Sequence, residues 1–207
     1  MSIKTRLDEE DDDDKPDEAE RGKQDDPLFM GVAKALYKSR TILIFGEIDT
    51  KLSERTTAHM LALSAESDDP IKIIINSPGG HVEAGDTICD MIRFIKPQVK
   101  ILGSGWVASM GCQIYLSAKR ENRYSLPNTR YMMHQPLGGV GGRASDIEIE
   151  AKEIIKMRER LNKFIAEATG QPLARITKDT DRNFWMGPQE AKDYGLVGHV
   201  ITNASEF

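Results

Sequence analysis

The sequence has 207 residues, of which 39 % are hydrophobic and 29 % charged, and its formal net charge is −5. These values are typical of a single soluble domain that is long enough to bury a core of its own. The sequence contains no run of 18 apolar residues, which excludes a transmembrane helix, and it starts without a secretory signal pattern, so we expect a cytoplasmic protein.

The negative charge is concentrated in residues 1–26, which carry twelve acids and five bases. Residues 27–207 carry 21 acids and 23 bases, so this part is nearly neutral and offers no basic footprint for nucleic acid. Like charges repel, and residues 1–26 contain almost no apolar side chain to bury. We therefore predict a disordered acidic tail over 1–26 and one folded domain over 27–207.

Helix-like and strand-like segments alternate after the tail. The hydrophobic spacing predicts helices at 27–38, 53–66 and 82–95, and strands at 41–45, 71–75, 99–102 and 130–134. Gly46 and the turn-like run 76–80 are predicted to end the first two strands. Met60, Leu61 and Leu63 are expected to face inward from the second helix. Repeated strand–helix–strand units imply an α/β fold with a mostly parallel sheet covered by helices.

A longer helix is predicted over residues 145–168, about 36 Å at about 1.5 Å per residue. Ser145 and Glu148 have the spacing of a capping box at its start. Its apolar residues lie on more than one side, so the helix needs cover from more than one side. It follows a flexible, strand-capable glycine run at 138–142. The pattern leaves open whether this helix is buried in the core or contacts another subunit.

Ser109 lies between a predicted strand and an apolar helix, in the sequence WVASMG. A serine at this place is either a helix N-cap or an exposed nucleophile on a strand-to-helix turn, where backbone N–H groups can hold an oxyanion. The surroundings do not match the GxSxG pattern of ordinary hydrolases. In the run 76–80, Gly79 and Gly80 indicate either a tight turn or backbone amides that approach a ligand closely.

A nucleophilic serine needs a base, and the sequence offers four histidines, His59, His81, His134 and His199. His59 falls within a predicted helix and His199 near the C-terminus, which favours structural or surface roles for both. His134 ends a predicted strand, where α/β active sites usually lie, and His81 follows the glycine turn. The residue pattern favours His134 and leaves His81 as the alternative.

Two further features of the sequence give little support for a cofactor or metal site. Residues 103–108 and Glu121 loosely match a dinucleotide fingerprint, but the match comes mid-chain and lacks a clear second strand. Cys89 and Cys112 lie in apolar stretches without metal-ligand spacing, so we expect reduced, buried thiols and no metal site.

Several motifs together resemble the proteolytic subunit of the Clp protease over about residues 38–202. They are NSPGG at 76–80, FIKP at 94–97, ASMG at 108–111, LPNTR at 126–130, MHQPLGG at 133–139, SDIEIEAKEI at 145–154 and EAKDYGLV at 190–197. The resemblance implies a crotonase-like α/β fold of repeated ββα-type units. It also implies a protruding handle, made of the long helix and the glycine-rich strand, that interlocks two stacked rings of seven subunits.

The same resemblance implies a serine endopeptidase that degrades unfolded proteins and peptides inside a ring chamber. It makes Ser109 the nucleophile and His134 the base, and it assigns the oxyanion-hole amides to Gly80 and Met110. Leu137, Gly138 and Gly139 match the positions beside which peptide substrates bind as added strands. The implied partner is an unfoldase of the AAA+ class that uses ATP. The chain itself has no Walker A motif, and we expect it to need no cofactor.

The third member of the implied triad departs from the family pattern, because Asn183 stands where the family has Asp. An Asn oxygen still accepts a hydrogen bond from the histidine but cannot offset the imidazolium charge. Asp181, two residues away, is a candidate substitute. We therefore expect a weak or conditional peptidase that a paralogous subunit activates; the alternative is a regulatory subunit that needs a paralogous active ring.

The positions implied for unfoldase docking also depart from the family pattern. Lys72 and Ser104 are more polar than the family's residues, beside Ile74, whereas Phe94, Tyr124 and Leu126 are retained. We expect rings made only of this chain to bind an unfoldase poorly. A crotonase-type acyl-CoA enzyme is a third reading, but the paired carboxylates that it would need near the oxyanion hole are not found.

Overall fold

The computed structural model describes residues 27–207, and the predicted acidic tail lies outside them. Contacts divide the chain into two units, Met1–Ser39 and Arg40–Phe207. In the first unit, helix α2 covers Pro27–Lys38 and confirms the helix predicted there.

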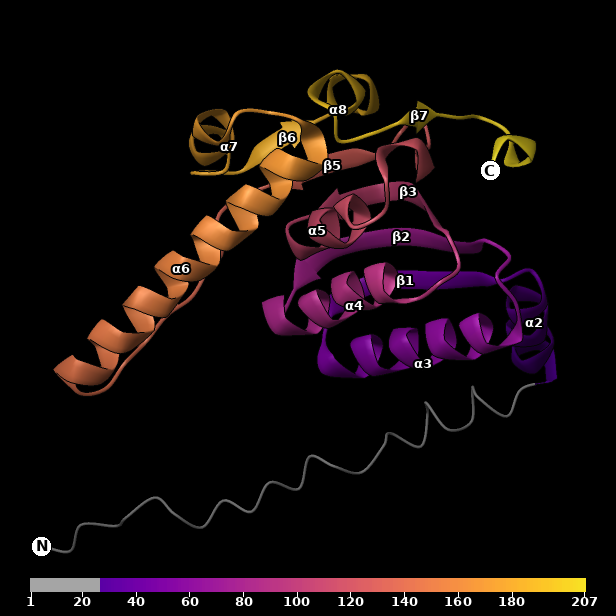
Figure 1. Cartoon of the computed structure of the whole chain (residues 1–207), viewed down its shortest axis with the longest axis horizontal. Helices are drawn as coiled ribbons and strands as arrows, with labels where there is room; N and C mark the ends of the chain where they lie inside the picture. The colour runs from indigo at the N-terminus through magenta and orange to yellow at the C-terminus, as the bar shows by residue number, and fades with distance from the viewer. Residues whose placement is uncertain (1–26) are drawn as a thin grey trace, which may run out of the picture. The chain divides into compact units, whose positions relative to one another are not determined.

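The second unit is built on a seven-stranded sheet (Figure 1). Its main path runs β1 (Thr41–Ile48), β2 (Ile71–Gly80), β3 (Val99–Ala108), β4 (Arg123–Ser125) and β7 (His199–Val200), all parallel. β5 (Arg130–Met133) pairs in parallel with the last part of β3, and β6 (Phe184–Met186) pairs antiparallel with β5. The predicted α/β class and mostly parallel sheet are confirmed.

The core lies between the sheet and three helices that follow its first three strands. These are α3 (Thr50–Glu66), α4 (Val82–Phe94) and α5 (Met110–Leu116). The side chains of β2 alternate, so that Ile71, Ile73 and Ile75 are fully buried, whereas Lys72 and Ile74 on the opposite face are partly exposed. This alternation is the period-two pattern of a strand with one face covered.

Three strands continue beyond their predicted ends, which corrects the sequence analysis. The strand predicted over 99–102, β3, runs to Ala108. β1 passes through Gly46 (φ 83°) with a register shift between Phe45 and Glu47, and β2 continues through the turn-like run to Gly80. The extended ends pair with each other, and these hydrogen bonds outweigh the local turn composition. One face of β1 stays uncovered in the single chain, where Phe45 is 51 % exposed.

Two of the three residues predicted to face inward from α3 are buried. Met60 and Leu63 are buried as predicted, but Leu61 is 45 % exposed, which corrects the prediction that it faces inward. The capping box predicted for Ser145 and Glu148 is wrong. The helix α6 (Ala144–Thr169) already begins one residue earlier, so Ser145 lies inside it.

The long helix α6 is not a core helix, which excludes one of the two alternatives that the sequence left open. Figure 1 shows its first half extending away from the sheet, and its buried residues, Leu161, Asn162, Ile165 and Thr169, all lie in the second half. Ile149 and Ile155 remain more than half exposed. The helix therefore presents apolar side chains to its surroundings.

Four further short helices are described. One is η1 (Arg120–Asn122), which directly precedes β4, and the others follow α6 in the chain: α7 (Leu173–Asp179), α8 (Pro188–Tyr194) and η2 (Ala204–Glu206).

The buried guanidinium of Arg123 donates to the carbonyl oxygens of Leu116, Ala168 and Leu196, which joins the last turns of α5 and α6 to the segment after α8. Burial lowers the pKa of Arg123 to about 10. None of the helices described for residues 27–207 is long and apolar enough to cross a membrane.

Candidate active site

The candidate catalytic residues lie at neighbouring strand ends. Ser109 directly follows β3, His134 directly follows β5, and Asn183 directly precedes β6. β3 and β5 are parallel, whereas β6 runs antiparallel to β5, so the end of β5 lies beside the start of β6. The topology therefore brings three residues that are far apart in the sequence to one edge of the sheet.

Their side chains form a hydrogen-bonded row. His134 Nε2 lies 2.7 Å from Ser109 Oγ, and His134 Nδ1 lies 3.0 Å from Asn183 Oδ1. When Nδ1–H donates to the Asn183 oxygen, Nε2 is left to accept the Ser109 hydroxyl proton. The alternative base, His81, instead contacts Glu83 at 3.2 Å. The arrangement matches a nucleophile, a general base and a residue that orients the base.

Ser109 is held in an unusual backbone conformation, with φ 53° and ψ −121°. Positive φ is costly for a residue other than glycine and is found most often at functional turns. The backbone N–H of Ser109 donates to Met132 O at 2.8 Å, and its carbonyl accepts from Cys112 N at 3.0 Å. Ser109 stands at the N-cap position of α5, but its side chain makes no capping hydrogen bond, so the hydroxyl is left to His134.

Gly79 packs directly against Ser109. A Cβ added at Gly79 would lie 2.6 Å from Ser109 Cβ and 3.0 Å from the amide nitrogen of Met110. Met110 is the first residue of α5, so its N–H has no acceptor within the helix and can serve an oxyanion. Gly80 lies tightly against β1, since a Cβ there would be 2.3 Å from Ile48 O. Only glycines fit both positions.

Two supporting residues were missed by the sequence analysis. Ser77 is fully buried, its hydroxyl donates to Gly46 O at 2.6 Å and accepts from Gly79 N at 3.1 Å, and it thereby fixes the Gly79 backbone. The buried thiol of Cys112 donates to Val107 O at 2.9 Å beneath the turn that carries Ser109. Burial raises the pKa of Cys112, as of Cys89, to about 12, so both thiols stay protonated at neutral pH.

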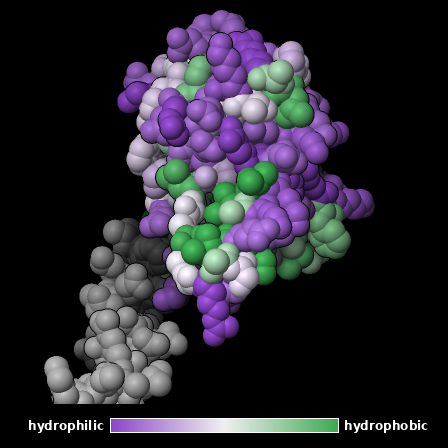
Figure 2. Space-filling view, turned by 90° about the vertical axis from the view of Figure 1, so that its left-hand side faces the viewer, coloured by the Kyte–Doolittle hydropathy of each residue, from purple (hydrophilic) through white to green (hydrophobic). Residues whose placement is uncertain are grey.

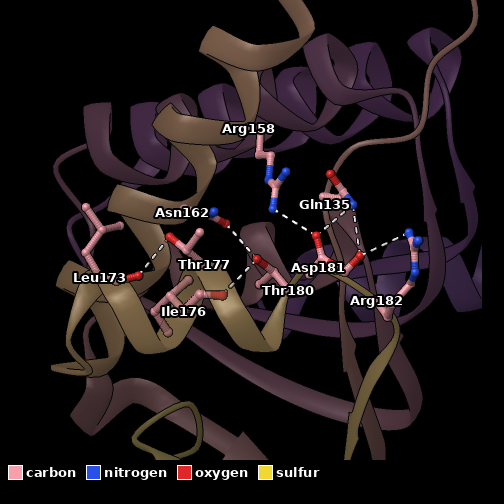
Figure 3. A network of polar contacts seen from close by, with 9 residues as sticks. All are labelled: Gln135, Arg158, Asn162, Leu173, Ile176, Thr177, Thr180, Asp181 and Arg182. Carbon is pink, nitrogen blue, oxygen red and sulfur yellow. Dashed lines mark hydrogen bonds and ion pairs between the residues drawn. The ribbon is translucent and has the colours of Figure 1, made fainter.

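The loop that delivers Asn183 is tied to the residue after His134 (Figure 3). Gln135 donates from its backbone to Thr180 O at 2.6 Å and from Nε2 to Asp181 O at 2.8 Å. The Asp181 carboxylate accepts from Arg158 Nη2 of α6 at 3.1 Å. The structure therefore does not bring Asp181 to His134, and the candidate substitute for Asn183 serves a different contact.

A second set of contacts joins the same loop to the helices around it. The Thr180 hydroxyl lies 3.0 Å from Asn162 Oδ1 of α6 and 2.8 Å from Ile176 O of α7 (Figure 3). Thr180 and Asn162 are both buried. The position of Asn183 thus depends on where α6 lies.

The expected substrate-binding residues follow His134 and run beside α6. Leu137 is 83 % exposed, and a Cβ added at Gly138 would touch Ile154 Cδ1 of α6 at 3.0 Å. Residues 137–142 form no strand, and in the described part of the chain they make no hydrogen bond to another backbone group. The expected glycine-rich strand is therefore absent from the single chain, and these backbone groups stay open to an added strand.

Apolar surface gathers on the side of the molecule from which α6 projects. Figure 2 shows hydrophobic residues in the lower half of this side, bordered by hydrophilic ones. The large exposed apolar residues of the glycine run and α6 are Leu137, Val140, Ile147, Ile149 and Ile155. Nearer the site, Trp106 and Trp185 stack with ring centroids 6.5 Å apart. Among the described residues, no group of three His, Cys, Asp or Glu could hold a metal ion.

Comparisons with known proteins agree with one another. The sequence model of the Clp protease family matches residues 24–204. The chain is 53 % identical over 201 residues to the ATP-dependent Clp protease proteolytic subunit 3 of Rhizobium etli, which covers 97 % of this chain and 100 % of that protein. A solved structure of ClpP1 from Listeria monocytogenes is 58 % identical with a TM-score of 0.77, and an Asn-to-Asp mutant of that ClpP1 is 59 % identical with a TM-score of 0.79. Each covers 84 % of this chain and 98 % of its own.

Proposed function

Because the chain belongs to the Clp protease family, as a proteolytic subunit of the ATP-dependent enzyme, we propose that it cleaves peptide bonds with Ser109 as nucleophile and His134 as general base. The observation that carries the proposal is the hydrogen-bonded row from Ser109 Oγ through His134 to Asn183 Oδ1. The strained turn at Ser109 and the glycines packed against it support the same roles.

The reaction follows from these contacts. Ser109 Oγ attacks the scissile carbonyl carbon while its proton passes to His134 Nε2. The negative charge that develops on the carbonyl oxygen is stabilised by the N–H of Met110, with Gly80 as the second donor. His134 then gives its proton to the leaving amine. A water molecule, deprotonated by His134, releases the peptide from Ser109 and restores the hydroxyl.

The substrate is a peptide bound in extended form along residues 137–142. The open backbone of these residues favours an added strand, because main-chain hydrogen bonds then supply affinity without dependence on sequence. Leu137, Gly138 and Gly139 stand at the start of this segment, next to His134. Such binding suits an enzyme that degrades unfolded chains.

Asn183 makes this activity weak or conditional in rings of this chain alone. Its oxygen orients His134 at 3.0 Å but carries no charge to stabilise the imidazolium that forms during attack. In a different serine protease, a change from Asp to Asn at the matching role lowers turnover by about 10⁴. In a mixed assembly, a paralogous subunit supplies the activity that this chain lacks. The second candidate function of this chain is that of a regulatory subunit in such an assembly.

The test is hydrolysis of a small fluorogenic peptide by the unmodified chain and by Asn183→Asp. We expect the variant to have at least a tenfold higher kcat, because the carboxylate offsets the imidazolium charge. Ser109→Ala in the Asn183→Asp background is the control and should abolish hydrolysis. Full activity of the unmodified homomer, equal to that of Asn183→Asp, would sink the proposal that Asn183 limits the reaction.

The proposal extends to the assembly in which the chain works. Two stacked heptameric rings, interlocked through α6 and residues 137–142, enclose the active sites in the cytoplasm, and an AAA+ unfoldase uses ATP to feed them. The exposed apolar residues of α6 support this arrangement, because such residues need cover. In this proposal the chain itself uses neither a cofactor nor ATP.

A further inference from the structure

Two ionisable side chains directly follow the end of β2 and take no part in the hydrogen-bonded row of the candidate active site. His81 Nδ1 lies 3.2 Å from Glu83 Oε2, and the two side chains are 66 % and 65 % exposed. The backbone N–H of His81 donates to Ile48 O at 2.8 Å, which fixes the start of α4 against the end of β1. The pair therefore stands at a defined place, directly beyond Gly80.

The end of β2 is open on the side that faces the candidate site. β2 pairs with β1 as far as Gly80, but its pairing with β3 ends at Ser77. Beyond that point, Gly79 packs against Ser109. A peptide whose scissile carbonyl accepts from the N–H of Gly80 must pass this end of β2. The substrate residues next to the cleaved bond therefore come close to His81 and the first turn of α4.

The long helix α6 contacts both sides of the path that this peptide would take. On one side, Ile154 lies where a Cβ added at Gly138 would be 3.0 Å from it. On the other side, Arg160 donates to Asp86 of α4 at 3.0 Å. Glu83 precedes Asp86 by almost one helical turn, so the two carboxylates lie on the same face of α4, with Glu83 nearer to the start of the helix. A peptide extended along the glycine run would thus have Glu83 on its other side.

The charge of Glu83 is less well compensated than that of its neighbour. Asp86 is paired with the guanidinium of Arg160, whereas the ion-pair partner of Glu83 within the described residues is His81. An imidazole compensates a carboxylate only while it is protonated. A lysine or arginine of a bound peptide would instead bring a permanent positive charge to Glu83, and an acidic residue there would be repelled.

We propose that Glu83, held beside the site by His81, makes the chain prefer peptides that carry a lysine or arginine next to the cleaved bond. This inference rests on the proposed function, because it names the substrate class of the same site. It gives His81, which the sequence offered as an alternative base, a role in substrate selection in place of proton transfer.

Hydrolysis of three matched peptides tests this inference. Each is an internally quenched peptide of alanine and glycine around one leucine, with lysine, glutamine or glutamate on both sides of the leucine, and mass spectrometry locates the cleaved bond. The assembled full-length chain is used in the Asn183→Asp background, with and without Glu83→Gln. We expect Glu83→Gln to lower the lysine-to-glutamate ratio of kcat/KM about fivefold, because it removes one attraction and one repulsion, each of them modest between exposed charges.

Two further variants separate the charge of Glu83 from its place in the helix. Glu83→Asp keeps the charge and should keep most of the preference. The matched control is Glu121→Gln, which makes the same change to an exposed carboxylate in the first turn of η1, before β4 and thus at the opposite edge of the sheet from the strand ends that carry Ser109 and His134. It should leave the ratio unchanged.

Binding is measured in parallel, by fluorescence anisotropy of fluorescein-labelled forms of the three peptides with Ser109→Ala and with Ser109→Ala combined with Glu83→Gln. We expect the same order of affinities, lysine above glutamine above glutamate, and a weaker order once Glu83 is changed. This readout decides the inference even if no peptide is cleaved.

Several outcomes would overturn the inference. Glu83→Gln could leave the ratio as it was, or it could lower the hydrolysis of all three peptides equally, which would mean a structural role. An equal fall in Glu121→Gln would assign the preference to the net charge of the chain. Hydrolysis without a charge preference contradicts only this inference, whereas a Glu83-dependent binding preference without hydrolysis contradicts only the proposed function.

Discussion

At the scale of single residues, the candidate site joins a serine, a histidine and an asparagine in one hydrogen-bonded row. Ser109 and His134 are 2.7 Å apart, in the geometry that a serine nucleophile and its base require. Asn183 holds the other ring nitrogen and thereby supports orientation without charge. A carboxylate at this position would both orient the His134 ring and compensate its positive charge. Asn183 supplies only the orientation.

The close contact between Gly79 and Ser109 leads to a prediction about hydrolysis. Gly79→Ala should lower kcat/KM about 100-fold or more, because a methyl group 2.6 Å from Ser109 Cβ must displace the nucleophile or the Met110 amide. Hydrolysis is measured in the more active of the unmodified and Asn183→Asp backgrounds. The control is Gly31→Ala in α2, where an added Cβ meets no atom within 4 Å. Unchanged hydrolysis by Gly79→Ala would refute the tight packing described for this turn.

Much of the residue-scale site could be predicted from the sequence, and the limits have a physical cause. Ser109 and His134 directly follow strands, and side chains at strand ends of an α/β sheet meet at one edge. The role of Gly79 could not be predicted, because it depends on how close β2 comes to the turn after β3. The same is true of Ser77, whose hydroxyl links Gly46 to Gly79 across two strands.

At the scale of elements, the active site is coupled to the long helix. Arg158 of α6 pairs with Asp181, Asp181 contacts Gln135, and Gln135 directly follows His134 (Figure 3). Asn183 stands two residues beyond Asp181 in the same loop. A displacement of α6 would therefore move both partners of the His134–Asn183 hydrogen bond.

This coupling predicts a role in positioning for Arg158. Arg158→Met should lower kcat several-fold with little change in KM, because the loop that presents Asn183 loses its anchor while substrate contacts remain. The matched control is Arg160→Met, which removes an ion pair of the same helix with Asp86 of α4. Thermal unfolding and size-exclusion chromatography show whether both variants fold and assemble. Equal effects of the two variants on kcat would mean that Arg158 has no special link to the site.

The sequence predicted which segments are helices or strands, but not where each of them ends. The helices and the four strands predicted from hydrophobic spacing exist, since periodicity identifies segments of this length well. The glycine-rich strand implied by the resemblance is absent from the single chain. β1 and β2 continue past Gly46 and through Gly80 because pairing between the two strands, invisible in the local sequence, outweighs the turn residues. The burial of α6 was left open because apolar residues on several sides fit both a core helix and a subunit contact.

At the scale of the whole molecule, two surfaces of the second unit stay uncovered in the single chain. The first half of α6 carries exposed apolar residues, and residues 137–142 have open backbone groups. In the proposed assembly, a neighbouring subunit covers both surfaces.

The account depends most on Ser109 being the nucleophile that His134 activates, and covalent labelling tests this directly. A phosphonofluoridate is incubated with the unmodified chain, with Asn183→Asp and with His134→Ala, and the adduct is located by mass spectrometry. The account predicts an adduct on Ser109, formed faster in Asn183→Asp than in the unmodified chain and absent from His134→Ala. An adduct on another residue, or none on Ser109 even in Asn183→Asp, would contradict it.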